Sequence, residues 1–546
     1  MKIALIQTNP LVGDCAGNVR SITNALTRVH QAQCSLAVFP ELALCGYPPQ
    51  DLLERASFLE AHERALAELL EFTQTIKELT CVLGGLGQAD GPGKSLYNTA
   101  FVLHNGTILA QAHKRLLPDY DVFDDTRHFA GGREAATFAC GRLYCALTIS
   151  EDLWWQEEKH GHNPLDDFML GSIVPDLLIN IAASPYHFGK RQERRKLFAS
   201  ICTTYNLPLV YVNQAGGQDS LVFDGHSLAM SSTGEMRAQA AGFSEDMLVV
   251  DFPVQTDVPA FSQPDEHIGD LAGALVCGLR DYVRKSGFSK AIIGLSGGID
   301  SALTAALACQ ALGADNLLGV ALPSPYTSEQ SIEDARQLAL NLGCAFECIP
   351  IQPAMDVYAQ ILDPFFTGLP SDVTEQNIQA RIRGNLLMAL ANKFNRLLLS
   401  TGNKSEVAVG YCTLYGDMCG ALAVLADVYK TQVYELSHWI NRNGAIIPQS
   451  TIIRPPTAEL KPGQLDQDDL PPYAVLDPIL QAYLEKGETV AAIAAGQQVD
   501  LALVRDIIRR IRRSEHKRVQ ASLNIRVSRK AFGLGRRVPV IQGFYE

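Results

Sequence analysis

The first half of the chain contains short apolar runs, each ending in glycine or polar residues, which is the pattern of buried β-strands. Between some runs the apolar positions recur at helical spacing, as from Val19 to Val29. Asn105-Gly106 separates two further apolar segments and predicts a tight hairpin. Strands that alternate with helices and hairpins predict a layered α/β sandwich over residues 1–255. The strand runs are Ile3–Ile6, Leu36–Phe39, Cys81–Leu86, Leu143–Ile149, Leu177–Ile181 and Leu209–Val212.

A stretch rich in proline and polar residues follows this first half, and we interpret residues 256–267 as an interdomain linker. From Ile268 onward a helix, a strand, a glycine-rich loop and another helix follow one another. This is the order of a doubly wound, Rossmann-like parallel sheet, so residues 268–546 are predicted to form a second α/β domain.

Length and composition agree with two globular domains. At 546 residues the chain is too long for one core, and its 47% hydrophobic and 19% charged residues are typical of a folded protein. The formal charge of −13 argues against a broad surface for nucleic acid or anionic membranes. The 13 cysteines include no Cys-x-x-Cys pair, and no apolar run resembles a signal peptide or a membrane span. We therefore expect a cytoplasmic protein without nucleic-acid or membrane partners.

The most informative motif joins a predicted strand to a predicted helix. Two glycines let the backbone turn its N–H groups toward an anion, and the following helix directs its positive end to the same place. Ser296 and Ser301 add hydroxyl donors, and Asp300 offers a carboxylate for the Mg²⁺ that accompanies a nucleotide. No lysine follows the glycines, so this is not a Walker loop. It resembles the pyrophosphate-binding PP-loop of enzymes that cleave ATP between its α and β phosphates, and it comprises Gly294, Leu295, Ser296, Gly297, Gly298, Ile299, Asp300 and Ser301.

Further polar strings follow predicted strands of the same sheet. Each by itself indicates only a helix cap, a turn or a solvated charge cluster. Together they surround the place where doubly wound folds bind nucleotides. The strings are Thr374–Asn385 with Arg381 and Arg383 at the start of a long helix, Leu399–Glu406, Gly410–Asp417, Asp427–Thr431 and Ser514–Arg518.

On these residues the second half resembles NAD synthetase, whose members adenylate the nicotinate carboxylate of deamido-NAD with ATP and replace AMP by ammonia. The resemblance implies that Thr401 and Lys430 bind ATP with the PP-loop and that Asp300 holds Mg²⁺. It also implies that Asn377, Glu406 and Lys517 contact deamido-NAD, with Glu406 doing so directly or through a metal. Residues 456–473 resemble the loop that folds over the adenylate.

The first half resembles the nitrilase-type amidases, which use glutamate, lysine and cysteine to release ammonia from an amide. The resemblance implies an αββα sandwich in which Glu41 is the general base and Lys114 stabilises the oxyanion. The nucleophile would stand at position 150. Tyr120, Ser184 and Lys190 match positions that hold glutamine in synthetases of the glutamine-dependent type.

Position 150 is a serine where the family pattern requires cysteine. A thiol is partly ionised near neutral pH and is intrinsically nucleophilic, whereas a hydroxyl needs a base arranged for it. Cys145 lies five positions earlier on the same strand, so it should point to the opposite face. We interpret Ser150 as an introduced replacement that traps glutamine or as a natural loss that leaves an ammonia-dependent enzyme. The completeness of the remaining amidase site favours the introduced replacement.

Two weaker motifs are assigned no function. Gly93-Lys94-Ser95 lacks the earlier glycine of a Walker loop and indicates a surface turn. Cys344 and Cys348 have no histidine or second cysteine pair at zinc spacing, and we expect them to be buried strand cysteines.

Three other functions remain open at this stage: a PP-loop synthetase or amidotransferase for a different acid, a tRNA-modifying enzyme, and an amidase or glutamine-binding module with an inert second domain. The strings at 374–385 and 400–431 argue against a synthetase for a different acid. The formal charge of −13 argues against a tRNA-modifying enzyme. The complete set of ATP motifs argues against the third. The resemblance also implies a homo-oligomer.

Overall fold

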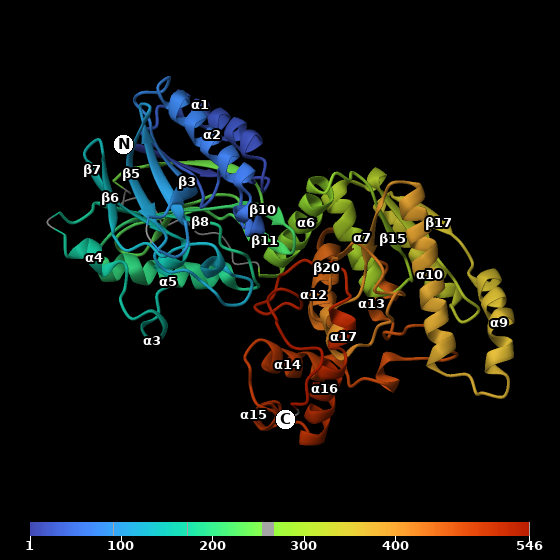
Figure 1. Cartoon of the computed structure of the whole chain (residues 1–546). Helices are drawn as coiled ribbons and strands as arrows, with labels where there is room; N and C mark the ends of the chain where they lie inside the picture. The colour runs from blue at the N-terminus through green and yellow to red at the C-terminus, as the bar shows by residue number, and fades with distance from the viewer. Residues whose placement is uncertain (91, 172, 254–266, 545–546) are drawn as a thin grey trace. The chain divides into compact units, whose positions relative to one another are not determined.

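The computed structural model describes residues 1–90, 92–171, 173–253 and 267–544. The chain divides into two compact units, Met1–His267 and Ile268–Glu546 (Figure 1). The predicted linker at 256–267 lies outside the described residues except for His267, which begins helix α6.

The first unit contains two six-stranded sheets, with strand orders β14-β1-β2-β3-β4-β5 and β13-β12-β9-β8-β7-β6. The first sheet consists of β1 (Lys2–Gln7), β2 (Leu36–Val38), β3 (Thr80–Gln88), β4 (Leu96–His104), β5 (Thr107–His113) and β14 (Asp246–Asp251). The second consists of β6 (Ala136–Cys140), β7 (Leu143–Ile149), β8 (Leu177–Ala182), β9 (Leu209–Asn213), β12 (Leu228–Met230) and β13 (Met236–Gln239). A separate ribbon is formed by β10 (Ala215–Gln218) and β11 (Leu221–Asp224).

Helices cover the outer face of each sheet. One core cluster lies between the two sheets and takes Ile3 and Leu5 from β1, while Ala4 and Ile6 of the same strand belong to the cluster under α1 and α2. Both faces of β1 are thus buried, which explains its continuous apolar sequence. The predicted αββα sandwich is confirmed. Its helices are α1 (Cys15–Gln31), α2 (Ala56–Thr73), α3 (Glu157–His160), α4 (Asp166–Met169) and α5 (Lys190–Tyr205).

The predicted hairpin joins β4 to β5. Asn105 and Gly106 have φ of 44° and 80°, the left-handed values that a tight two-residue hairpin needs. Gly93-Lys94-Ser95 lies in the exposed connection between β3 and β4, in agreement with a surface turn.

The second unit has one all-parallel sheet with strand order β17-β16-β15-β18-β19-β20. The order reverses between β15 and β18, so the doubly wound prediction is confirmed. The strands are β15 (Ala291–Gly294), β16 (Leu317–Ala321), β17 (Ala345–Cys348), β18 (Leu397–Ser400), β19 (Leu422–Ala423) and β20 (Leu523–Asn524). The helices are α6 (His267–Lys285), α7 (Ile299–Leu312), α8 (Glu329–Leu342), α9 (Gln352–Phe366), α10 (Val373–Lys393), α11 (Lys404–Val409), α12 (Lys430–Ile440), α13 (Gln449–Ile453), α14 (Tyr473–Leu484), α15 (Val490–Gln497), α16 (Leu501–Arg513) and α17 (Glu515–Arg518).

Two local predictions are wrong. Arg381 and Arg383 lie in the middle of α10, because Asp372 caps that helix and starts it earlier. Cys344 is only half-buried and Cys348 is exposed, because β17 forms an edge of the sheet. Among the described residues, no helix combines the length and the apolar character that crossing a membrane requires.

Candidate active sites

The PP-loop runs from the end of β15 into α7. Gly297 has φ of 81°, and a Cβ atom at this position would lie 2.3 Å from the backbone oxygen of Ser331. Both the left-handed backbone and the close approach require glycine here. The Gly298 N–H donates to Ser296 Oγ at 3.2 Å, and Ser301 Oγ donates to the Gly298 carbonyl at 3.0 Å. These bonds hold the turn open at the N-terminus of α7, where an anion is favoured.

A cavity of about 300 Å³ lies at the carboxyl ends of β15 and β18, where the strand order reverses. Every predicted ATP-binding residue lines it, together with Glu406. Arg383, Arg454 and Asp466 also line it; Arg383 and Asp466 belong to the segments 374–385 and 456–473 that the sequence patterns had placed around the nucleotide, whereas Arg454 had no predicted role. The predicted ATP site residues in the lining are Gly294, Leu295, Ser296, Gly297, Gly298, Ile299, Asp300, Ser301, Thr401 and Lys430.

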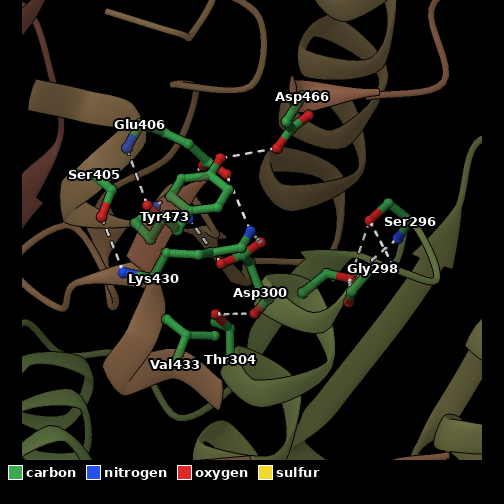
Figure 2. A network of polar contacts seen from close by, with 12 residues as sticks. Ser296, Gly298, Asp300, Thr304, Ser405, Glu406, Lys430, Val433, Asp466 and Tyr473 are labelled. Carbon is green, nitrogen blue, oxygen red and sulfur yellow. Dashed lines mark hydrogen bonds and ion pairs between the residues drawn. The ribbon is translucent and has the colours of Figure 1, made fainter. Parts of the chain in front are cut away.

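A buried charge network crosses this cavity (Figure 2). Lys430, the first residue of α12, is 2% exposed and donates to Asp300 and to Glu406, the latter at 3.2 Å. Tyr473 donates to Asp466 Oδ2 at 2.8 Å, and its ring centroid lies 5.3 Å from Lys430 Nζ. The network therefore connects the PP-loop with α11, α12 and the segment that ends at α14.

Burial sets the proton affinities in this network. Burial raises the pKa of Glu406 to about 8; Lys430 opposes the rise, and Asp300 and Asp466 add to it. Burial acts to lower the pKa of Lys430, but Asp300 and Glu406 outweigh it and raise the pKa above its usual value. The lysine therefore stays charged between the two carboxyl groups.

Asp300 and Glu406 are the side chains that could hold a divalent cation. Their carboxyl groups converge on one point, because both bond to the Lys430 ammonium. Carboxylate oxygens are the ligands that Mg²⁺ prefers. The residues present fit a magnesium ion.

The three residues predicted for deamido-NAD separate into two places. Glu406 lines the cavity, whereas Asn377 and Lys517 meet at the loop 410–417 and are not in the lining. Lys517 Nζ donates to the carbonyls of Gly410 at 2.8 Å and Cys412 at 2.7 Å. Asn377 Oδ1 accepts from Thr413 at 2.7 Å. Both side chains therefore organise this loop.

In the first unit, Lys114 joins two buried carboxylates. Its Nζ lies 2.8 Å from Glu41 Oε1 and 2.7 Å from Asp125 Oδ2, and all three side chains are at most 5% exposed. Glu41 also accepts from Asn98 Nδ2 at 2.7 Å and from the Ala183 N–H at 2.8 Å. Burial opposes the charge on Lys114, but the two carboxylates outweigh it and raise its pKa. Glu41 and Lys114 are thus brought together as predicted.

Ser150 stands at the junction between β7 and a 3₁₀ turn, Ser150–Leu153. It is 8% exposed and has φ of 46°, a strained value for a residue with a side chain. Cys145 lies in the core between the sheets, where burial raises its pKa to about 12. Cys145 therefore cannot replace a nucleophile at position 150.

Asp152 ties the turn to the segment that carries Lys114. Its Oδ1 accepts from the N–H groups of Arg115 and Leu116, both at 2.9 Å, and its Oδ2 accepts from the N–H of Ile149 at 3.0 Å. One carboxylate thus bonds to the neighbours of both Lys114 and Ser150. The structure brings the ends of β5 and β7 together at this point.

The predicted glutamine-binding residues lie around the same strand ends. Tyr120 donates to Glu151 Oε1 at 2.8 Å, and Lys190 Nζ lies 3.6 Å from the ring centroid of Trp154. The Ser184 N–H donates to Asn213 Oδ1 at 2.9 Å. Glu151 and Trp154 follow Ser150 closely in sequence, so Tyr120 and Lys190 contact the turn that position 150 begins.

Sequence reasoning missed several residues of the two sites, notably Asp125, Asp152 and Asn403. Asn403 lies within the predicted string Leu399–Glu406, and Asp125 and Asp152 follow Lys114 and Ser150 along the chain, but no sequence pattern gave these three residues a role of their own. The roles of all three depend on partners that are distant in sequence or on the far side of a turn.

Comparisons with known proteins agree with this architecture. A family model described as NAD synthase matches residues 271–521, and one described as carbon-nitrogen hydrolase matches residues 2–257. The chain is 46% identical to the glutamine-dependent NAD(+) synthetase of Synechocystis sp., with 100% of this chain and 99% of the relative covered. It is 41% identical to that of Thermotoga maritima, with the same coverage.

Solved structures match along nearly the whole chain. A glutamine-dependent NAD+ synthetase from Acinetobacter baumannii, solved in complex with adenosine diphosphate, is 38% identical with a TM-score of 0.77, and 99% of this chain and 98% of that chain are covered. A glutamine-dependent NAD(+) synthetase from Cytophaga hutchinsonii shares the fold at 20% identity and a TM-score of 0.82, with coverage of 99% and 97%.

Proposed function

The chain belongs to the glutamine-dependent NAD(+) synthetases, and we propose that it combines a working ATP-dependent synthetase site with an amidase site that lacks its usual nucleophile. It is a C–N ligase that makes NAD from deamido-NAD. The observation that carries the proposal is the cavity in which the PP-loop, Asp300, Glu406 and Lys430 converge.

In the proposed reaction, a nicotinate carboxylate oxygen of deamido-NAD attacks the α-phosphorus of ATP. The bond to pyrophosphate breaks and an acyl-adenylate forms. Ammonia then attacks the acyl carbon, AMP leaves, and the nitrogen loses a proton to give the amide. A carboxylate is a poor electrophile, and adenylation supplies the leaving group that it lacks.

The residues of the cavity have complementary tasks in this reaction. The N–H groups of the PP-loop and the N-terminus of α7 face the phosphates, and Lys430 adds a positive charge. Thr401 completes the ATP contacts. Asp300 and Glu406 would hold Mg²⁺, which supplies positive charge for the displaced pyrophosphate.

Deamido-NAD would bind beside the same cavity. We assign it Glu406 together with Asn377 and Lys517, which shape the loop 410–417. Residues 456–473 would close over the adenylate. Two contacts support this assignment, because Ser331 Oγ donates to Glu459 Oε1 at 2.9 Å and Gln379 Nε2 donates to the Leu460 carbonyl at 3.0 Å. Both contacts connect this segment to elements that line the cavity.

In the amidase site, Glu41 would act as the base, and Lys114 would stabilise the oxyanion of the tetrahedral intermediate that forms when the amide carbon of glutamine is attacked. Tyr120, Ser184 and Lys190 would hold the substrate. Ser150 offers a hydroxyl where the chemistry calls for a thiol, so we propose that this half binds glutamine and hydrolyses it poorly. The intact contacts of Glu41 and Lys114 favour a replacement introduced at one position, and a natural loss is the alternative.

An assay of nitrogen sources tests this function. Purified protein is given ATP, Mg²⁺ and deamido-NAD with either ammonia or glutamine, and NAD and AMP are measured. We expect synthesis with ammonia and little synthesis with glutamine. Failure with ammonia would overturn the synthetase assignment, and equal rates with both sources would overturn the interpretation of Ser150.

We also propose that the chain forms a homo-oligomer. Helix α9 has no buried residue, and Val357, Ile361 and Phe365 are 53%, 62% and 75% exposed on one stripe of it. A continuous apolar stripe in water favours burial against another surface. A second copy of the chain is the proposed partner.

A further inference from the structure

We propose that Asn403 is a positioning residue of the synthetase site, which holds Asp300 and Glu406 in the arrangement that binds Mg²⁺ together with ATP. The inference rests on the proposed function, because it assumes that these two carboxylates serve a magnesium ion. Asn403 is fully buried and lies between β18 and α11, beside the cavity.

The side-chain amide of Asn403 bonds to residues of both elements that carry the carboxylates. Its Nδ2 donates to Asp300 Oδ1 at 2.9 Å, and its Oδ1 accepts from the N–H of Glu406 at 3.0 Å. Asp300 belongs to α7 and Glu406 to α11, and the two residues are far apart in sequence. A single neutral side chain therefore links the two elements.

These bonds fix the orientation of Asp300. Its Oδ2 accepts from the Lys430 ammonium, so each carboxylate oxygen has a donor on a different element. An oxygen that accepts one hydrogen bond keeps a second lone pair for a cation. Asn403 thus restrains Asp300 without using up its capacity to bind metal.

Asn403 also determines the direction of Glu406. Asn403 is the N-cap of α11, and Glu406 is the third residue of that helix, so the pair forms a capping box. Glu406 Oε1 then accepts from Lys430 at 3.2 Å. The helix cap and the lysine together hold this carboxyl group beside Asp300.

A helix cap alone would not need an asparagine. Serine and aspartate cap helices about as well, but they cannot bond to Asp300 as the amide of Asn403 does. The hydroxyl of Asn403→Ser is one bond shorter than the amide nitrogen, so it caps the helix but does not reach Asp300 from the same backbone position. The carboxylate of Asn403→Asp has no donor and repels Asp300. The two variants therefore separate positioning from capping.

The test measures ATP binding, in addition to NAD synthesis. ATP is titrated calorimetrically into the full chain at increasing Mg²⁺ and in the presence of a chelator. In the unaltered protein we expect Mg²⁺ to tighten ATP binding. In Asn403→Ser the Mg²⁺ concentration for half of this effect should rise about tenfold or more, while ATP affinity with chelator changes little. Asn403→Asp should show a larger rise.

The matched control is Asp500→Ser at the N-cap of α16, where Asp500 accepts from the Ala502 N–H at 2.9 Å and lies outside the cavity lining. Its Mg²⁺ dependence should be unchanged. The inference is overturned if both Asn403 variants keep the Mg²⁺ dependence of the unaltered protein. It is also overturned if they lose ATP affinity equally with and without Mg²⁺ and melt at lower temperature, because that is the result of a structural cap. If the unaltered protein binds ATP without any effect of Mg²⁺, the proposed magnesium site fails first, and this inference fails with it.

Discussion

At the scale of single residues, we propose that the side-chain oxygen of Ser150 determines which nitrogen source the chain uses. Ser150 occupies a strained turn beside a complete and buried Glu41–Lys114–Asp125 network. Such a turn presents its side chain at a defined point, and a hydroxyl there is a weaker nucleophile than the thiol that amidases of this type use. The proposed consequence is that the geometry of the amidase site is kept while glutamine hydrolysis is slow.

Replacing Ser150 by cysteine should therefore restore the amidase. We expect Ser150→Cys to raise kcat/KM for glutamine-driven NAD synthesis by at least about a hundredfold, with the ammonia-driven rate unchanged. Both rates are measured on the same preparations. Ser150→Ala, which should resemble the serine protein, is the control. A cysteine variant that remains inactive with glutamine would show a further defect in the amidase half.

The pKa of Glu406 predicts how Mg²⁺ binding depends on pH. Because burial raises this pKa to about 8, the metal-free site keeps a proton on Glu406 at pH 7, and the metal must displace it. Affinity for Mg²⁺ in the presence of ATP should rise by up to about tenfold per pH unit from pH 6.5 to 8 and then level off. Titrations across this range measure the slope, and Glu406→Gln should abolish it.

The same group affects stability with a definite sign. The pKa of Glu406 is higher in the folded state than in an unfolded chain, so its contribution to stability is present at low pH and is lost as pH rises through about 8. Without Mg²⁺, the unfolding free energy of the second unit should fall as the pH rises toward about 8, and it should fall more steeply in the unaltered protein than in Glu406→Gln. Added Mg²⁺ and ATP should reverse the fall.

At the scale of secondary structure elements, the ATP site consists of β15, the PP-loop turn and α7. The backbone of the turn passes close to α8. Gly297 meets the Ser331 carbonyl at the start of that helix, so α8 limits the space available to the PP-loop. The continuous apolar run before the glycines predicted β15, the stretch after Ser301 predicted α7, and the glycines predicted the turn. The approach of α8 could not be predicted, because it depends on how two helices pack on the same sheet.

Adding one methyl group at Gly297 should disrupt this element. Gly297→Ala forces an L-residue into the left-handed region, at about 1–2 kcal/mol, and creates a backbone clash with Ser331. ATP affinity should fall about tenfold or more in calorimetric titrations. Gly343→Ala is a matched control, because Gly343 has φ of 70° and a Cβ atom there would meet only Ala314 Cβ at 4.0 Å, an ordinary van der Waals contact; it should lower stability and leave ATP affinity unchanged. Equal ATP affinity in the two variants would contradict the argument.

At the scale of the whole molecule, two units with separate cores carry two separate sets of polar residues. Each set lies where strand ends of its own sheets meet, which is how α/β folds create sites from segments distant in sequence. The exposed stripe on α9 is a third feature at this scale, and it belongs to neither site.

The apolar stripe on α9 predicts that copies of the chain associate through this helix. One charge placed within the stripe should weaken that association. Ile361→Glu should shift the protein toward the monomer in size-exclusion chromatography with light scattering, because it places a charge within the apolar stripe. Gln360→Glu adds the same charge at the neighbouring exposed position and should leave the mass unchanged. An identical mass for all three proteins would show that α9 is not the contact between copies.

The sequence by itself predicted six strands of the first unit, the hairpin, the two α/β folds and the PP-loop, because these depend on local spacing and residue chemistry, and it contains serine at position 150. The family resemblance implied that Glu41 and Lys114 share one site and that Asp300 and Glu406 share another, but only the tertiary structure shows which groups bond to each of them. Lys114 lies between Glu41 and Asp125, and Asn403 joins Asp300 to Glu406, across sequence separations that no local pattern spans. Such contacts follow from the order of strands in a sheet, which brings distant chain segments to one edge.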